Sequence, residues 1–161
     1  MTIARAATLQ ETLRITKVPP NGLGWHKEIK TGLPYRSLLS VAKTLKLSEK
    51  DFIQLLGMTP RTAAARKKAK RLGGAESDLI YAVARAYVRL SSFKPIEDAR
   101  SWLLAPVEAL KGSVPVELLQ TRLGTEYVMS TIDRERSAVI KTSLDHQLEQ
   151  ASEESISADE E

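Results

Sequence analysis

The sequence predicts an all-α protein with an N-terminal helix-turn-helix bundle, a small helical C-terminal domain and a disordered acidic tail. Leu and Ala dominate the 161 residues, and aromatic residues make up only 5% of them. No long run of Val, Ile or Thr alternates with polar residues, so no strand is expected. The expected boundaries are an N-terminal segment 1–28, a helix-turn-helix domain 29–93, a C-terminal domain 94–141 and a tail 142–161.

Amphipathic patterns define the longer helices. A helix is predicted from Tyr35 to about Leu45, because Leu38, Ala42 and Leu45 recur at the helical period. Another amphipathic helix is expected over residues 75–93. The C-terminal domain is predicted to form short helices broken at Pro106, Gly112-Ser113, Pro115 and Gly124.

Two sharp local signals lie between these long helices. Ser48 is a good N-cap for a short helix, and Gly57 can adopt the left-handed conformation that ends it. Thr59 then caps a second helix with Pro60 at its first position, where a missing N–H costs nothing. Helix, tight turn and helix in this order outline a helix-turn-helix.

The second of these helices is unusually basic. Residues 58–72 hold six Lys or Arg and no acid, although ordinary surface helices mix both signs. Such a helix fits the DNA major groove, where basic side chains reach phosphates and alanines approach thymine methyl groups. Gly73 and Gly74 are expected to end it. The residues expected to contact DNA are Thr59, Arg61, Thr62, Arg66, Lys67, Lys68, Lys70 and Arg71.

A helical wheel assigns roles within this segment. Arg61 and Lys67 are the first candidates for base edges, and the other basic residues are assigned to phosphates. The small residues divide between two faces. The residues expected to face the protein are Thr62, Ala65, Ala69 and Leu72, and those expected to face outward are Ala63 and Ala64.

Charge is distributed along the chain as a gradient. Residues 1–74 carry 15 basic and 4 acidic residues, residues 75–141 carry 9 of each, and residues 142–161 carry 7 acids and no Lys or Arg. A basic first half suggests a polyanionic partner. The tail has few large apolar residues, so it is predicted to be mostly disordered. A charged surface without a nucleic-acid partner is the alternative.

Several function classes are not expected. There is no cysteine, so disulfides and thiolate metal sites are excluded. No secretory signal or membrane-spanning run is visible, which predicts a cytoplasmic protein without membrane contact. The two histidines are far apart, and no hydrolase, metalloprotease or nucleotide-binding motif is present. We therefore expect no catalysis, no metal and no cofactor.

The C-terminal domain has more apolar residues than so short a segment can bury alone. They pack on the first half, on a second copy or on a partner, and for any one of them the ordinary core is the commoner role. A two-fold dimer would suit a palindromic DNA site. The candidate dimer or partner interface comprises Trp102, Leu103, Leu104, Leu110, Leu118, Leu119, Val128, Ile132, Arg134 and Arg136.

Two stretches resemble a known family. "TGLPYRSLLSVAKTLKLSEKDFIQLLGMTPRTAAARKK" with "ESDLIYAVARAYV" resembles the N-terminal part of the Xre/MbcA/ParS-type antitoxins, and "DARSWLLAPVEALKGSVPVELLQTRLGTEYVMSTIDR" resembles their C-terminal domain. Arg61-Thr62 and Arg66-Lys67 match the basic residues after the turn. The C-terminal residues that match the family pattern are Ala99, Trp102, Leu103, Pro106, Leu110, Gly112, Pro115, Leu118, Leu119 and Gly124.

The resemblance implies an antitoxin of a type II toxin–antitoxin pair. Such proteins dimerise through the C-terminal domain, repress their own operon by binding operator DNA, and neutralise a toxin. The toxin is commonly of the RES class, which depletes NAD⁺. The chain departs from the family at its end, where an acidic tail follows "IDRERSAVIKTSLDHQ".

Two other functions remain open from the sequence. One is a free-standing helix-turn-helix regulator whose C-terminal domain only dimerises. The other is an interaction scaffold whose basic helix meets an acidic protein. The tail has three interpretations: a solvating end, an added contact to a basic toxin cleft, or a cover for the basic helix.

Overall fold

The computed structural model describes residues 7–158, with side chains as far as residue 155, and this part is helical without a β-strand. Isolated β-bridges link Pro34 to Arg71 and Val107 to Ser113. The predicted all-α class is therefore confirmed. The helices are α1 (Leu9–Leu13), α2 (Gly22–Thr31), α3 (Tyr35–Thr44), α4 (Glu49–Leu55), α5 (Pro60–Ala69), α6 (Gly74–Ser91), α7 (Ile96–Leu104), η1 (Glu108–Leu110), α8 (Pro115–Leu118) and α9 (Arg122–Ala158).

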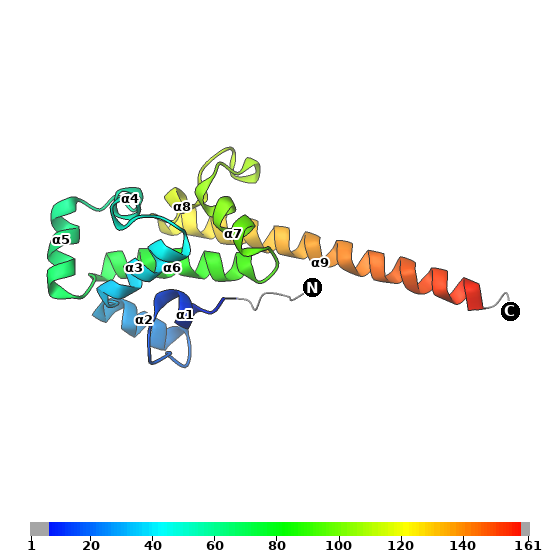
Figure 1. Cartoon of the computed structure of the whole chain (residues 1–161), viewed down its shortest axis with the longest axis horizontal. Helices are drawn as coiled ribbons and strands as arrows, with labels where there is room; N and C mark the ends of the chain where they lie inside the picture. The colour runs from blue at the N-terminus through cyan, green and yellow to red at the C-terminus, as the bar shows by residue number, and fades with distance from the viewer. Residues whose placement is uncertain (1–6, 159–161) are drawn as a thin grey trace.

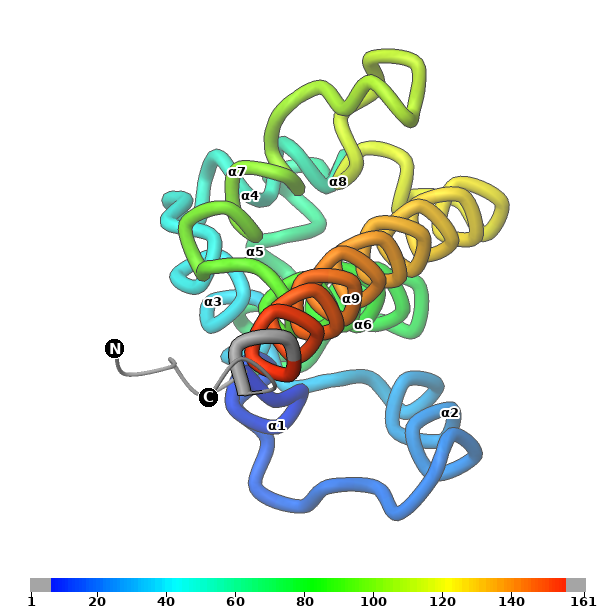
Figure 2. Tube along the Cα trace, turned by 90° about the vertical axis from the view of Figure 1, so that its right-hand side faces the viewer, coloured from blue at the N-terminus to red at the C-terminus, as the bar shows by residue number. Residues whose placement is uncertain are grey.

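Helix α6 is the centre of the molecule. It packs against α1, α2 and α3 from the first half and against α7 and α9 from the second. Figure 1 shows α5 at one end of the molecule and the free end of α9 at the other, and Figure 2 shows α9 running beside α6. One buried apolar cluster extends from Leu13 to Ile132, so the two halves share a core.

The first residues are integrated into this core. Ser37 Oγ donates a hydrogen bond of 2.6 Å to the Leu13 carbonyl, which ties α1 to α3. Trp25 is buried on α2, with its ring 5.1 Å from that of Tyr81 on α6. Helix α1 and most of α2, which lie in the predicted N-terminal segment 1–28, thus pack onto the N-terminal bundle.

The predicted turn signals are confirmed. The Ser48 side chain accepts a hydrogen bond of 3.1 Å from the Asp51 amide and caps α4. Gly57 has a φ of +71° directly after α4, and such a φ favours glycine. The Thr59 side chain accepts a hydrogen bond of 3.1 Å from the Thr62 amide, and Pro60 occupies the first turn of α5.

The end of the basic helix differs from the prediction. Helix α5 ends at Ala69, and Lys70 already has the left-handed φ of 57°, so the Gly73-Gly74 pair does not end it. The Lys70 carbonyl accepts a hydrogen bond of 3.1 Å from the Tyr35 amide, and the Leu72 amide donates 2.8 Å to the Leu33 carbonyl. These bonds to a distant segment draw residues 70–72 out of the helix.

The predicted disordered tail is also wrong for the residues described. Helix α9 continues without interruption from Arg122 to Ala158. The segment from Thr142 is rich in helix-forming Leu, Gln and Glu, and it extends a helix whose costly nucleus is already packed on α6. Helical order here does not depend on burial, because the described side chains of this segment are exposed. Residues 159–161 of the predicted tail lie outside the described residues.

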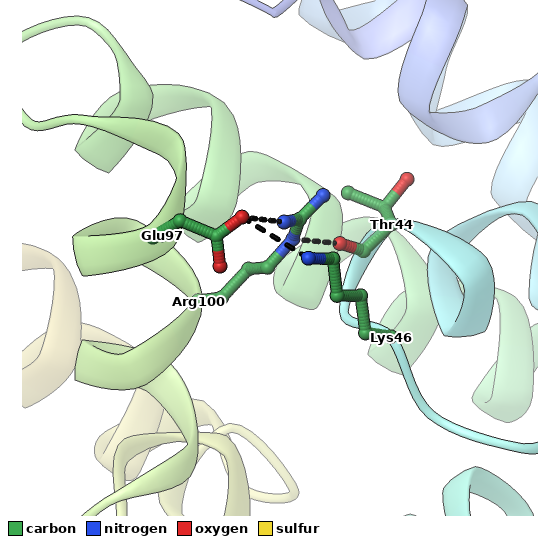
Figure 3. A network of polar contacts seen from close by, with 4 residues as sticks. All are labelled: Thr44, Lys46, Glu97 and Arg100. Atoms are coloured by element: carbon green, nitrogen blue, oxygen red, sulfur yellow. Dashed lines mark hydrogen bonds and ion pairs between the residues drawn. The ribbon is translucent and has the colours of Figure 1, made fainter.

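A polar network joins α7 to the end of α3 (Figure 3). Arg100 donates to the Thr44 carbonyl at 2.5 Å and to the Glu97 carboxylate at 2.8 Å. Lys46 lies 3.1 Å from the same carboxylate. The shared core and this network hold the two halves in one arrangement.

Candidate functional site

Helix α5 lies at one end of the molecule (Figure 1), and it buries little of its own surface. Ala63 is its single buried residue, with 5% of its surface exposed. The predicted faces are therefore partly wrong, because Ala65 and Ala69 are exposed and Ala63 faces inward. The prediction failed because it continued the helix to Leu72. Leu72 is buried, as expected, but by the chain segment after the helix.

Lys67 is held by α4. Its ammonium lies 3.3 Å from both carboxylate oxygens of Glu49. The Tyr35 hydroxyl donates a hydrogen bond of 2.7 Å to the same carboxylate. The hydrogen bond from Tyr35, with a further contribution from Lys67, holds the pKa of Glu49 below its usual value. Burial and the adjacent carboxylate raise the pKa of Tyr35, so its hydroxyl remains a donor.

Two further basic residues bind within the chain. Arg66 Nε lies 3.1 Å from a carboxylate oxygen of Glu76, and Arg71 donates 2.7 Å to the Gly32 carbonyl. Glu76 is largely buried, with 15% of its side chain exposed, so this pair is more than a loose surface contact. Arg66, Lys67 and Arg71 therefore also anchor α5, a role that sequence reasoning missed because their partners are 10 to 39 residues away.

The remaining basic residues are Arg61, Lys68 and Lys70. All are exposed, and none has an ion pair within the described part of the chain. Arg61 and Lys68 lie on the same helix as the exposed Ala64 and Ala65. Small residues between long cations allow a helix axis to approach DNA closely while the cations reach the phosphates. Thr59 is exposed at the helix N-terminus. Its hydroxyl donates a hydrogen bond of 2.9 Å to the hydroxyl of the half-buried Thr62.

The predicted C-terminal interface mostly fills the core of the protomer. Leu103, Leu110, Leu119, Val128 and Ile132 are buried. This outcome agrees with the alternative of an ordinary core role. The half-buried members are Trp102, Leu104 and Leu118.

Three residues of the predicted interface have polar groups on or beside α9: Trp102, Arg134 and Arg136. Trp102 Nε1 donates 2.9 Å to Glu135, which also lies 3.1 Å from Lys94. Arg134 and Arg136 are exposed, and Arg134 donates 3.3 Å to the Thr131 hydroxyl. These two arginines are the members of the predicted set that remain open to a partner.

Close packing in this domain depends on a glycine. A Cβ at Gly124 would lie 1.9 Å from the Leu118 carbonyl, so only glycine permits α8 to approach the start of α9.

Sequence reasoning missed a different feature on α9. Exposed apolar residues lie along the outer face of this helix, and their spacing of three and four was the available signal.

A short helix, a glycine turn and an exposed basic second helix define a helix-turn-helix protein. Two family models match the chain in the same order. Residues 24–85 match the antitoxin Xre-like helix-turn-helix domain, and residues 93–137 match the antitoxin Xre/MbcA/ParS C-terminal toxin-binding domain. The chain belongs to the Xre-type antitoxins, which confirms the family resemblance.

The family assignment rests on these two domain matches. A search of curated proteins found no match for the chain. No helix in residues 7–158 is long and apolar enough to cross a membrane.

Proposed function

We propose that this antitoxin represses its own operon by binding operator DNA as a homodimer and that it neutralises a RES-type, NAD⁺-depleting toxin. The observation that carries the DNA part is the exposed face of α5. Arg61 and Lys68 project there beside small residues and have no acidic partner in the described part of the chain. The toxin part rests on the matched toxin-binding domain and on the family resemblance.

The DNA contacts are assigned by availability. Arg61 is the candidate for a base edge, because it lies in the first turn of α5 beside Thr62 and Ala64. Lys68 and Lys70 are assigned to phosphates. Thr59, Thr62, Arg66 and Arg71 keep their predicted place near the DNA, with Arg66 and Arg71 also anchoring the helix.

A charge reversal tests the DNA contacts. The pair Arg61→Glu and Lys68→Glu should abolish binding to the duplex upstream of the coding sequence, because phosphate neutralisation supplies most of the affinity. Fluorescence anisotropy across a salt series is the measurement. If a wild-type dimer contacts about six phosphates, its affinity should drop roughly 10³-fold between about 50 and 200 mM salt.

A matched pair controls for net charge. Lys17→Glu with Lys111→Glu makes the same change at two exposed positions away from α5. This control should bind DNA with an affinity close to that of the wild type. Equal loss in both pairs would show a non-specific charge effect and contradict the assigned interface.

Co-expression tests the toxin part. The protein encoded beside this chain should arrest growth and lower cellular NAD⁺ when expressed alone, and the antitoxin should reverse both effects. Arg61→Glu with Lys68→Glu should still reverse them if DNA binding and neutralisation use separate surfaces. Growth arrest without a fall in NAD⁺ would reject the RES class, and no arrest would favour a free-standing regulator.

A further inference from the structure

The second half of α9 extends beyond the rest of the protomer. Figure 1 shows it leaving the helical bundle as a single rod. None of the described side chains after Ile132 is buried. The exposed apolar side chains of this extension suggest that another surface covers it.

Large apolar side chains are exposed along this helix. Exposed fractions are 63% for Leu123, 59% for Tyr127, 53% for Leu144 and 69% for Leu148. Single exposed apolar residues are common, but a row of them on one helix marks an interaction surface. One pair lies beside the bundle and the other lies on the projecting segment, and Val139 and Ile140 are exposed between them on other faces of the helix.

The spacing is that of a coiled coil. Steps of four and three alternate from Leu123 without interruption, which is the a and d pattern of a heptad repeat. Its two ends are apolar and its middle is polar. We name these positions the α9 seam: Leu123, Tyr127, Ser130, Arg134, Ser137, Lys141, Leu144, Leu148 and Ala151.

The seam faces away from its own protomer. Val128 and Ile132 are fully buried against the bundle and lie on the opposite side of the helix from Tyr127 and Arg134. Every seam residue is exposed. A second helix can therefore lie along the whole seam.

We propose that the α9 seam pairs with the seam of a second copy in antiparallel orientation. In one register Leu123 faces Leu148 of the second copy, and Tyr127 faces Leu144. This register places each a position against a d position, as antiparallel coiled coils require. Both apolar ends are then covered at once, and the polar middle faces itself around the two-fold axis.

Charge favours this orientation over a parallel one. The described segment after Lys141 has four carboxylates and no Lys or Arg. Parallel pairing would place these acids against their own copies. Antiparallel pairing instead separates the two acidic segments, which then lie at opposite ends of the pair. The apolar, polar and apolar parts of the seam follow in the same order from either end, so the seam fits a second copy of itself, and this symmetry commits the occupant to a second copy.

The polar middle has a further consequence. Polar residues at a and d positions reduce stability but select one register and partner. Ser130, Arg134, Ser137 and Lys141 leave the apolar ends as the main source of affinity. Much of the seam lies beyond residue 137, where the match to the toxin-binding domain ends. This inference specifies the interface of the homodimer in the proposed function. It rests on that function only for the biological role of the dimer.

Oligomeric state tests the pairing. Light scattering coupled to gel filtration should give twice the 17.8 kDa chain mass for the wild-type protein at micromolar concentration. Leu144→Glu with Leu148→Glu should halve the observed mass. Val139→Glu with His146→Glu adds two acids to the opposite face and should leave the dimer unchanged. A wild-type monomer, or a dimer that survives Leu144→Glu with Leu148→Glu, would overturn the proposal.

Cross-linking tests the orientation, because the chain has no native cysteine. Leu123→Cys protein mixed with tagged Leu148→Cys protein should give a mixed disulfide dimer on mild oxidation. Either protein oxidised alone should remain largely uncross-linked. Cross-linking of Leu123→Cys to itself would show parallel pairing and contradict the register.

The result separates this inference from the proposed function. A monomeric wild-type protein that still binds its upstream duplex and its neighbour's product would reject the seam alone. A seam dimer that binds neither would reject the proposed function alone. If Leu144→Glu with Leu148→Glu abolishes neutralisation while the wild-type antitoxin is monomeric, the seam binds the toxin and the self-pairing is wrong.

Discussion

Helix α5 and the projecting half of α9 are both exposed helices, but they are held in different ways. Helix α5 is short and is fixed by long-range bonds. Lys67 and Arg66 join it to α4 and α6, and the Lys70 carbonyl joins its end to Tyr35. The projecting half of α9 continues the helix from its packed start, and none of its described side chains is buried. Under the two proposals, α5 docks into DNA and is therefore held rigidly by the rest of the protein. The seam of α9 is itself the interface, so the projecting helix needs no such support.

Truncating a large apolar side chain should give the largest difference in stability between the two regions. Phe52 is fully buried on α4 beneath the turn that leads to α5. Phe52→Ala should lower the free energy of unfolding by about 3–5 kcal/mol. Leu148→Ala on α9 should change it by about 0.5 kcal/mol or less at concentrations where the protein is monomeric. Urea denaturation followed by circular dichroism measures both, and equal losses would contradict the contrast.

The bracing of α5 can be broken at one glycine. Gly32 has a φ of +100°, and a Cβ there would lie 2.2 Å from the Leu72 carbonyl. Gly32→Ala should therefore cost about 3 kcal/mol of stability, through backbone strain together with the clash against the Leu72 carbonyl. Gly112→Ala is the matched control, since Gly112 also has a positive φ but open space around it. The loss at Gly112 should be clearly smaller, and similar losses would mean that close packing at Gly32 is unimportant.

The charge on α5 can be adjusted rather than removed. Glu49→Gln should release Lys67, which can then act as one more phosphate contact. The affinity for a scrambled duplex should rise several-fold, and the slope of log affinity against log salt should steepen by about 0.9 per protomer. Lys67→Gln should cancel this gain in the double variant. A gain that persists without Lys67 would show that Glu49 acts only through net charge.

The smallest effect concerns pH. The pKa of Glu49 is lowered in the folded state, so its contribution to stability is present above the unfolded-state pKa and is lost as pH falls through the folded-state value. The wild-type protein should thus lose more stability than Glu49→Gln between about pH 5 and pH 3. Urea midpoints at several pH values measure this difference. Parallel curves would contradict the assigned hydrogen bond.

Local signals predicted the parts of the fold that depend on neighbouring residues. Ser48, Gly57, Thr59 and Pro60 were placed correctly because capping and turn geometry involve atoms only a few residues apart. The breaks at Pro106, Gly112 and Pro115 were predicted for the same reason, but the break expected at Gly124 was wrong, because Gly124 lies within α9. The end of α5 was not predicted, because residues 33–35 compete for the backbone of residues 70–72.

The candidate site shows the same division. Helical periodicity and charge are local properties, and they were enough to predict an all-helical protein with a helix-turn-helix and a basic second helix. The family resemblance then implied an antitoxin. Which cations remain available was decided by Glu49, Glu76 and Gly32, which are distant in sequence and adjacent only after folding. Likewise, packing against α6, α8 and η1 separated the buried face of α9 from the seam that the protomer leaves exposed, because burial is a property of the folded chain.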